Sequence, residues 1–238
     1  MPIPHALRAA LPPSDRAETA LTAALNGHGC PELDLSRLAG ALIQSPGHVV
    51  LGAPSSWTDA QLRWAYVVIL RHFGRLNDRY GLLFDVVDQG LDHTLSNAPV
   101  SKTRAATGMH TDSSDTNYNP DLVALLCIHQ GASGGKSLLA NASETLGRLR
   151  LCHPELEAVG RTAWPRDVVT PGVQGHLSAI QANAIPVFSE DERGLEFRYM
   201  RYWTERAMKK LGRSVPSELT ALFDFLDQDM ATHAFGFQ

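Results

Sequence analysis

The spacing of apolar residues predicts helices in the first third of the chain. Apolar residues recur at helical intervals over 57–73, and Thr58 and Gln61 have the spacing of an N-terminal capping box. Two shorter helices are expected before this one, over 15–26 and 34–42. Three helices are therefore expected within the first third of the chain.

Short apolar runs without helical spacing predict strands in the middle of the chain. These strands are expected over 48–51, 82–87, 121–130, 136–140 and 195–199. Later helices are expected over 143–152, with Ser143 as the cap, and over 202–211 and 216–230, while 154–186 should hold short strands and loops. Strands with helices packed outside them predict an α+β fold around a β-sandwich or barrel. Because no repeat or linker interrupts the pattern, we expect a single domain over 1–238.

Composition and charge narrow the class of partner. Apolar residues make up 44% and charged residues 19% of the chain, and the formal net charge is -4. These values are typical of a globular protein, and they give no reason to expect nucleic acid or an anionic membrane as a partner. No apolar run is long enough to span a bilayer. The three cysteines are too few and too widely spaced for a disulfide framework, so a cytoplasmic protein is expected, and homo-oligomer formation stays open.

The tripeptide His110-Thr111-Asp112 is the strongest candidate for chemistry. In an extended chain, His110 and Asp112 point to one side and Thr111 to the other. An imidazole and a carboxylate on one side can bind one metal ion, and a second histidine from elsewhere would complete the facial triad of an iron(II) oxygenase. The ordinary alternative is a solvated pair on the surface, because short motifs of this kind also arise by chance.

A competing motif lies in the glycine-rich stretch 131–135. Its Gly-x-Ser-x-Gly pattern is that of a serine hydrolase nucleophile turn, with Ser133 as the nucleophile and Asp167 and His176 as the remaining members of a triad. Such a turn needs a helix directly after it. Because 136–140 is predicted to be a strand, the sequence favours a hairpin turn here instead.

Several segments taken together resemble the TauD/TfdA family of iron(II)- and 2-oxoglutarate-dependent dioxygenases, in the clavaminate synthase-like group. The segments that carry the resemblance are His110-Thr111-Asp112, the polar loop after it, the apolar run 120–127, and Gly134-Gly135-Lys136-Ser137. The resemblance extends from about Thr58 to Gln238 and includes 186–188 and 198–199.

The resemblance implies a double-stranded β-helix (jelly roll) flanked by helices. It also implies that His110 and Asp112 bind Fe(II), with 2-oxoglutarate and O2 as co-substrates. Ser137 matches a hydroxyl that contacts a carboxylate of 2-oxoglutarate in the family, although it could equally be an ordinary strand hydroxyl. Because relatives that halogenate have a small residue in place of Asp112, the resemblance implies hydroxylation or desaturation of an unactivated C–H bond.

One part of the family pattern is missing from the sequence. A late His-Gly-Arg segment, which supplies the third iron ligand and an arginine for 2-oxoglutarate, does not occur. We therefore expect the third ligand to lie beyond Gln238. We also expect the chain to lack the C-terminal strand or strands of the fold. His233 is the alternative ligand, but it is more simply interpreted as a packing or surface histidine. A non-catalytic jelly-roll relative stays open as a further alternative.

The substrate is expected to be small and polar, such as an amino acid or a small carboxylate. This expectation rests on polar residues in the loops 92–107 and 113–119 beside the predicted metal site, namely Asn97, Lys102, Arg104, Asp115, Asn117 and Tyr118. Arg198 and Arg201 are further candidates for binding an anionic group. Any of these residues could instead be an exposed side chain without a ligand.

Overall fold

The computed structural model describes residues 39–42, 47–53, 55–77, 81–90, 103, 107–112, 120–167, 176–192 and 194–237. Contacts divide the chain into two compact units. Unit 1 consists of Met1–Phe84 and Ala124–Ser133, and unit 2 of Asp85–Val123 and Gly134–Gln238. That the whole chain forms one domain stays a prediction.

Unit 1 is built on helix α4 (Asp59–Phe73). The capping box is present as predicted, because the Thr58 hydroxyl accepts the Gln61 N–H (3.3 Å) and the Gln61 side chain accepts the Thr58 N–H (2.9 Å). Its buried face carries Trp64, Ala65 and Val67. Of the two earlier helices, only 39–42 is described and it is helical, whereas 15–26 and the rest of 34–42 lie outside the described residues.

Three predicted strands are wrong. Residues 48–51, 82–87 and 121–130 form no strand, and several of their apolar side chains are exposed, among them Val50, Val86 and Leu125. A strand forms only where a second segment supplies hydrogen-bond partners for its backbone. An apolar run by itself cannot show whether that partner exists.

Unit 2 contains all of the strands in the described part of the chain, as three antiparallel pairs. Strand β1 (Ser137–Leu139), which confirms the strand predicted over 136–140, pairs with β6 (Phe235–Phe237). Strand β2 (Trp164–Pro165) pairs with β3 (Ala184–Ile185), and β4 (Phe188–Asp191) with β5 (Gly194–Phe197). These pairs neither establish nor exclude a jelly roll, which stays a prediction.

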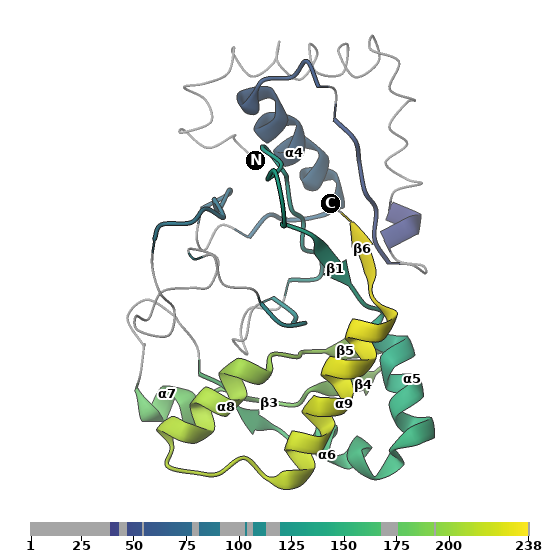
Figure 1. Cartoon of the computed structure of the whole chain (residues 1–238), viewed down its shortest axis with the longest axis vertical. Helices are drawn as coiled ribbons and strands as arrows, with labels where there is room; N and C mark the ends of the chain where they lie inside the picture. Colours follow the sequence, from purple (N-terminus) through teal and green to yellow (C-terminus); the bar gives the residue numbers. More distant parts are fainter. Residues whose placement is uncertain are drawn as a thin grey trace. The chain divides into compact units, whose positions relative to one another are not determined.

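Helices α8 (Arg201–Lys210) and α9 (Ser217–His233) confirm the two helices predicted near the end of the chain. Helix α9 contacts α5 (Ala142–Cys152), the 3-10 helix η2 (Pro154–Leu156) and α6 (Glu157–Arg161) (Figure 1). Its core residues recur at helical spacing and are all buried: Leu219, Leu222, Phe223, Leu226 and Met230. This stripe packs with Tyr199, Phe188 and Leu149 in the main core of unit 2.

The helices between the predicted elements were missed, and one cap was placed wrongly. Helices η2, α6 and α7 (Leu177–Ala182) lie where mostly short strands and loops were expected. Helices this short form because tertiary packing stabilises them, and their own sequence carries little helical signal. At the start of α5, Asn141 and not Ser143 is the cap, because its side-chain oxygen accepts the N–H groups of Ser143 and Glu144.

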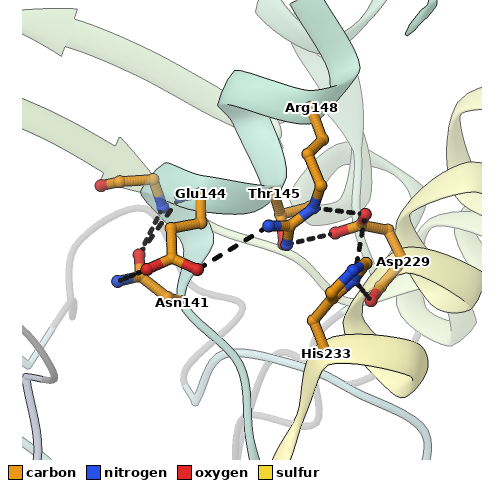
Figure 2. A network of polar contacts seen from close by, with 7 residues as sticks. Asn141, Glu144, Thr145, Arg148, Asp229 and His233 are labelled. Carbon is orange, nitrogen blue, oxygen red and sulfur yellow. Dashed lines mark hydrogen bonds and ion pairs between the residues drawn. The ribbon is translucent and has the colours of Figure 1, made fainter.

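A polar network joins α5 to α9 (Figure 2). The guanidinium of Arg148 donates to both carboxylate oxygens of Asp229, at 2.7 and 2.8 Å. The Asp229 side chain is only 7% exposed. Burial by itself would raise the pKa of Asp229, but hydrogen bonds from Arg148 and Thr145 and the charges of Arg148 and His233 hold that pKa below its ordinary value.

We expect Asp229→Asn to destabilise the protein by about 1–3 kcal/mol at neutral pH, because a charged, two-point hydrogen bond to a buried carboxylate is lost. The unfolded state binds a proton on Asp229 more readily than the folded state does, since the folded pKa is the lower of the two. The stabilisation is therefore complete above the unfolded pKa of about 4 and is lost as the pH falls from there through the folded pKa. Thermal unfolding of both proteins from pH 7 to pH 3 checks this. The difference in melting temperature between wild type and Asp229→Asn should narrow on acidification. A difference that stays constant would contradict the lowered pKa of Asp229.

Candidate functional site

Thr111 fixes the predicted metal-binding segment to the core of unit 2. Its backbone N–H donates to the carbonyl of Tyr199 (2.8 Å). Its hydroxyl lies 3.3 Å from that same carbonyl and accepts the backbone N–H of Tyr199 at 3.0 Å. Although 107–112 is not part of a strand, these bonds hold it alongside the residues that follow β5.

The side chains on either side of Thr111 converge, as the alternation of an extended chain predicted. Nε2 of His110 lies 3.5 Å from Oδ1 of Asp112. The imidazole is 28% and the carboxylate 51% exposed, so a ligand can reach both. We call these two side chains the His110–Asp112 pair.

The second nitrogen of His110 determines what the pair can bind. Nδ1 lies 2.8 Å from the carbonyl oxygen of Gly108, and because a carbonyl only accepts, Nδ1 carries the proton and donates it. In the neutral imidazole, Nε2 then presents a lone pair toward the carboxylate of Asp112. A cation placed between two such acceptors would interact favourably with both.

Either a proton or a metal ion can be that cation. The hydrogen bond with Asp112 outweighs the opposing effect of burial and raises the pKa of His110 above its ordinary value, with help from the Gly108 carbonyl and the charge of Asp112. A metal ion fits the same place, because two donors bound to one ion at about 2.1 Å lie roughly 3 Å apart. Histidines that bind a metal ion usually donate a hydrogen bond from their other ring nitrogen, often to a backbone carbonyl. The donor set therefore suits iron(II).

A second pair of the same residue types shows what distinguishes the site. In unit 1, His129 Nε2 lies 3.2 Å from Asp59 Oδ2, but these side chains are 80% and 57% exposed. Within the described residues, no cluster of three or more histidine, cysteine or acidic side chains suited to a metal ion is found. In the described part of unit 2, no third side chain of these types joins the His110–Asp112 pair in such a cluster.

His233 lies in the last turn of α9 and takes part in the network of Figure 2. Its Nδ1 is 2.9 Å from the carbonyl oxygen and 3.4 Å from a carboxylate oxygen of Asp229. Because the imidazole is 46% exposed, His233 is a surface histidine held at the end of α9 by these contacts.

Ser137, the predicted contact to 2-oxoglutarate, is the first residue of β1 and pairs with Phe237 in the ladder. It is half-buried and belongs to the same unit as the His110–Asp112 pair. Its role stays a prediction.

The hydrolase motif lacks the context that it needs. The glycine-rich stretch 131–135 is followed by β1 and not by a helix, as the sequence predicted. Asp167, the proposed triad acid, is buried and forms ion pairs with Arg206 and Lys210, with Oδ2 at 2.7 Å from Arg206 Nε and from Lys210 Nζ. The carboxylate is therefore engaged in a structural ion pair with α8.

The residues proposed for substrate binding divide into two groups. The loop residues Asn97, Lys102, Arg104, Asp115, Asn117 and Tyr118 lie outside the described residues. Arg198 is buried, and Arg201 is paired with Glu205 (2.6 Å), Asp224 (2.7 Å) and Asp227 (3.1 Å). Arg201 therefore serves the contacts of α8 with α9.

Tyr199 is the residue of this site that the sequence did not reveal. Its side chain is fully buried, its hydroxyl donates to Asp227 (2.6 Å), and its ring packs edge-on against Phe223. Burial and the hydrogen bond to Asp227 raise the pKa of Tyr199, so its hydroxyl stays protonated and neutral. The sequence placed Tyr199 in a predicted strand and in a segment of the family resemblance, but it did not reveal the contact with Thr111.

Comparison with known proteins assigns the chain to a family. No helix in the described part of the chain combines the length and apolar character that crossing a membrane requires. A search of curated proteins found no match. The family model described as "Taurine catabolism dioxygenase TauD, TfdA family" matches residues 32–236, which is most of the chain and includes the His110–Asp112 pair. The resemblance read from the sequence is thereby confirmed, and the chain belongs to the TauD/TfdA family of iron(II)- and 2-oxoglutarate-dependent dioxygenases.

Proposed function

We propose that the protein is an iron(II)- and 2-oxoglutarate-dependent oxygenase that hydroxylates or desaturates an unactivated C–H bond of a small polar substrate, such as an amino acid or a small carboxylate. The observation that carries the proposal is the pair of acceptor atoms, His110 Nε2 and Asp112 Oδ1, which face each other at 3.5 Å on one side of an anchored segment. Family membership supplies the reaction class.

His110 and Asp112 would hold the iron through Nε2 and the carboxylate. Iron and 2-oxoglutarate together supply, when bound, the activation of O2 that C–H oxidation requires. Gly108 contributes by accepting the Nδ1 proton of His110, which keeps the Nε2 lone pair available. Asp112 contributes a negative charge that offsets part of the charge of the cation.

Two further assignments belong to the same proposal. Ser137 would donate its hydroxyl proton to a carboxylate of 2-oxoglutarate, and the third iron ligand would come from a residue outside the described part of the chain. The retained carboxylate of Asp112 favours hydroxylation or desaturation over halogenation. A cytoplasmic location suits the protein because Cys127 and Cys152 are exposed free thiols.

The test is turnover of 2-oxoglutarate. Protein supplied with Fe(II), O2 and 2-oxoglutarate should form succinate, and formation should rise in the presence of one or more members of a panel of amino acids and small carboxylates. Removal of iron with a chelator should abolish succinate formation, and added Fe(II) should restore it. Wild-type protein that forms no succinate with any member of the panel would favour the non-catalytic alternative. Covalent labelling of Ser133 by a fluorophosphonate would instead support the hydrolase.

A further inference from the structure

We propose that Thr111 is a positioning residue, whose hydroxyl sets the direction of the His110 and Asp112 side chains by binding both backbone groups of Tyr199. The inference rests on the proposed iron site. It assigns to the middle residue of the tripeptide a task distinct from those of its neighbours.

Three contacts tie Thr111 to one residue. The Thr111 N–H donates to the Tyr199 carbonyl at 2.8 Å, and the Thr111 hydroxyl lies 3.3 Å from the same carbonyl and accepts the Tyr199 N–H at 3.0 Å. Backbone alone would supply just the first of these contacts. The hydroxyl adds the other two. Because these two contacts are made by the side chain, they fix the rotation of residue 111 about the chain axis.

Tyr199 is itself held rigidly, so it can act as a fixed support. It is fully buried, with its ring 5.7 Å from that of Phe223 and 6.2 Å from that of Phe197, measured between centroids. Its hydroxyl donates to Asp227 on α9 at 2.6 Å. The residue before it, Arg198, donates its N–H to the carbonyl of Val187 at 2.7 Å. Tyr199 is therefore anchored through both its side chain and its neighbouring backbone.

The direction of His110 and Asp112 follows from this anchor. Successive side chains of an extended segment point to opposite sides, so turning the Thr111 side chain inward turns both neighbours outward together. The imidazole and the carboxylate then meet at 3.5 Å. A residue that lacks the hydroxyl would leave the Tyr199 N–H without this partner and would free the segment to rotate.

Replacing Thr111 by valine tests the proposal, because valine keeps the branched shape and removes only the hydroxyl. We expect Thr111→Val to bind Co(II), used as a spectroscopic probe of the iron site, about tenfold more weakly than wild type, as is typical when a residue that orients a metal ligand is lost. Thr111→Ser, which keeps the hydroxyl, should bind Co(II) nearly as tightly as wild type. The visible absorption of bound Co(II) reports the ligand arrangement directly.

Two controls separate positioning from general stability. Thr220→Val removes a half-buried hydroxyl that donates to the Pro216 carbonyl (3.2 Å) in the first turn of α9, and it should leave Co(II) affinity unchanged. Asp229→Asn lowers stability at a different place in unit 2 and should also leave Co(II) affinity unchanged. Melting temperatures of all variants without metal show how much stability each has lost.

The possible outcomes distinguish this inference from the proposed function. The positioning role is supported if Thr111→Val binds Co(II) weakly while Thr111→Ser and both control variants bind it as tightly as wild type. Equal affinity in Thr111→Val and wild type overturns the inference and leaves the iron site standing. Affinity that falls with melting temperature across all variants also overturns it. If Asp112→Ala binds Co(II) as tightly as wild type, the proposed iron site is overturned, and this inference falls with it.

Discussion

Asp112→Ala is expected to abolish 2-oxoglutarate turnover and to weaken Co(II) binding by more than about a hundredfold, because loss of a ligand should exceed the 10–100-fold effect of losing a residue that merely orients one. The substitution removes the carboxylate that faces His110 Nε2 at 3.5 Å. His110→Ala should have an effect of similar size. Succinate release and Co(II) absorption measure the two effects independently.

The exposed pair in unit 1 offers a matched control for this prediction. His129 and Asp59 have the same two side-chain types at 3.2 Å, but their exposed fractions are 80% and 57%. His129→Ala and Asp59→Ala should therefore leave Co(II) binding and succinate formation at the wild-type level. Full turnover in Asp112→Ala, or equal losses in both pairs of variants, would refute the proposed site.

Gly160→Ala is expected to destabilise unit 2 by about 1–3 kcal/mol or more, because the added methyl group overpacks a filled core. A Cβ at Gly160 would overlap the ring of Phe188, whose side chain is 1% exposed. The ring cannot easily move aside, since the Arg161 guanidinium lies 5.6 Å from its centroid and the Gly160 carbonyl accepts the Val187 N–H at 2.8 Å. The denaturant midpoint, followed by circular dichroism, measures the loss.

Gly147→Ala is the matched control, and it should shift the midpoint the other way. Gly147 lies within α5, and a Cβ there would meet no atom within 4 Å. Alanine in the interior of a helix is favoured over glycine by up to about 1 kcal/mol, so this variant should be slightly more stable than wild type. A Gly160→Ala variant as stable as Gly147→Ala would show that the packing around Phe188 is looser than described.

Sequence reasoning succeeded where the deciding interactions are close together in the chain. The capping box of α4 uses Thr58 and Gln61, three positions apart. That His110 and Asp112 lie on one side follows from the alternation of an extended segment. Because both arrangements follow from local backbone geometry, the sequence was sufficient to identify them.

It failed where a distant partner decides the outcome. The apolar run 121–130 was predicted to be a strand and is not, whereas β1 is a strand because β6, far along the chain, supplies its hydrogen bonds. The short helices α6 and α7 likewise depend on buried contacts such as those of Gly160 and Ile180. Pairing between remote segments is not encoded in the apolar pattern of either segment alone.

By itself, then, the sequence determined the family, the tripeptide that carries the candidate metal ligands, and the amphipathic helices α4, α8 and α9. Only the tertiary structure decided that Tyr199 supports Thr111, that Asp229 on α9 pairs with Arg148 on α5, and that Arg198 is buried. The physical reason is that a ligand type is a property of one residue, whereas its direction and its support come from backbone and side-chain groups that folding brings together from distant positions.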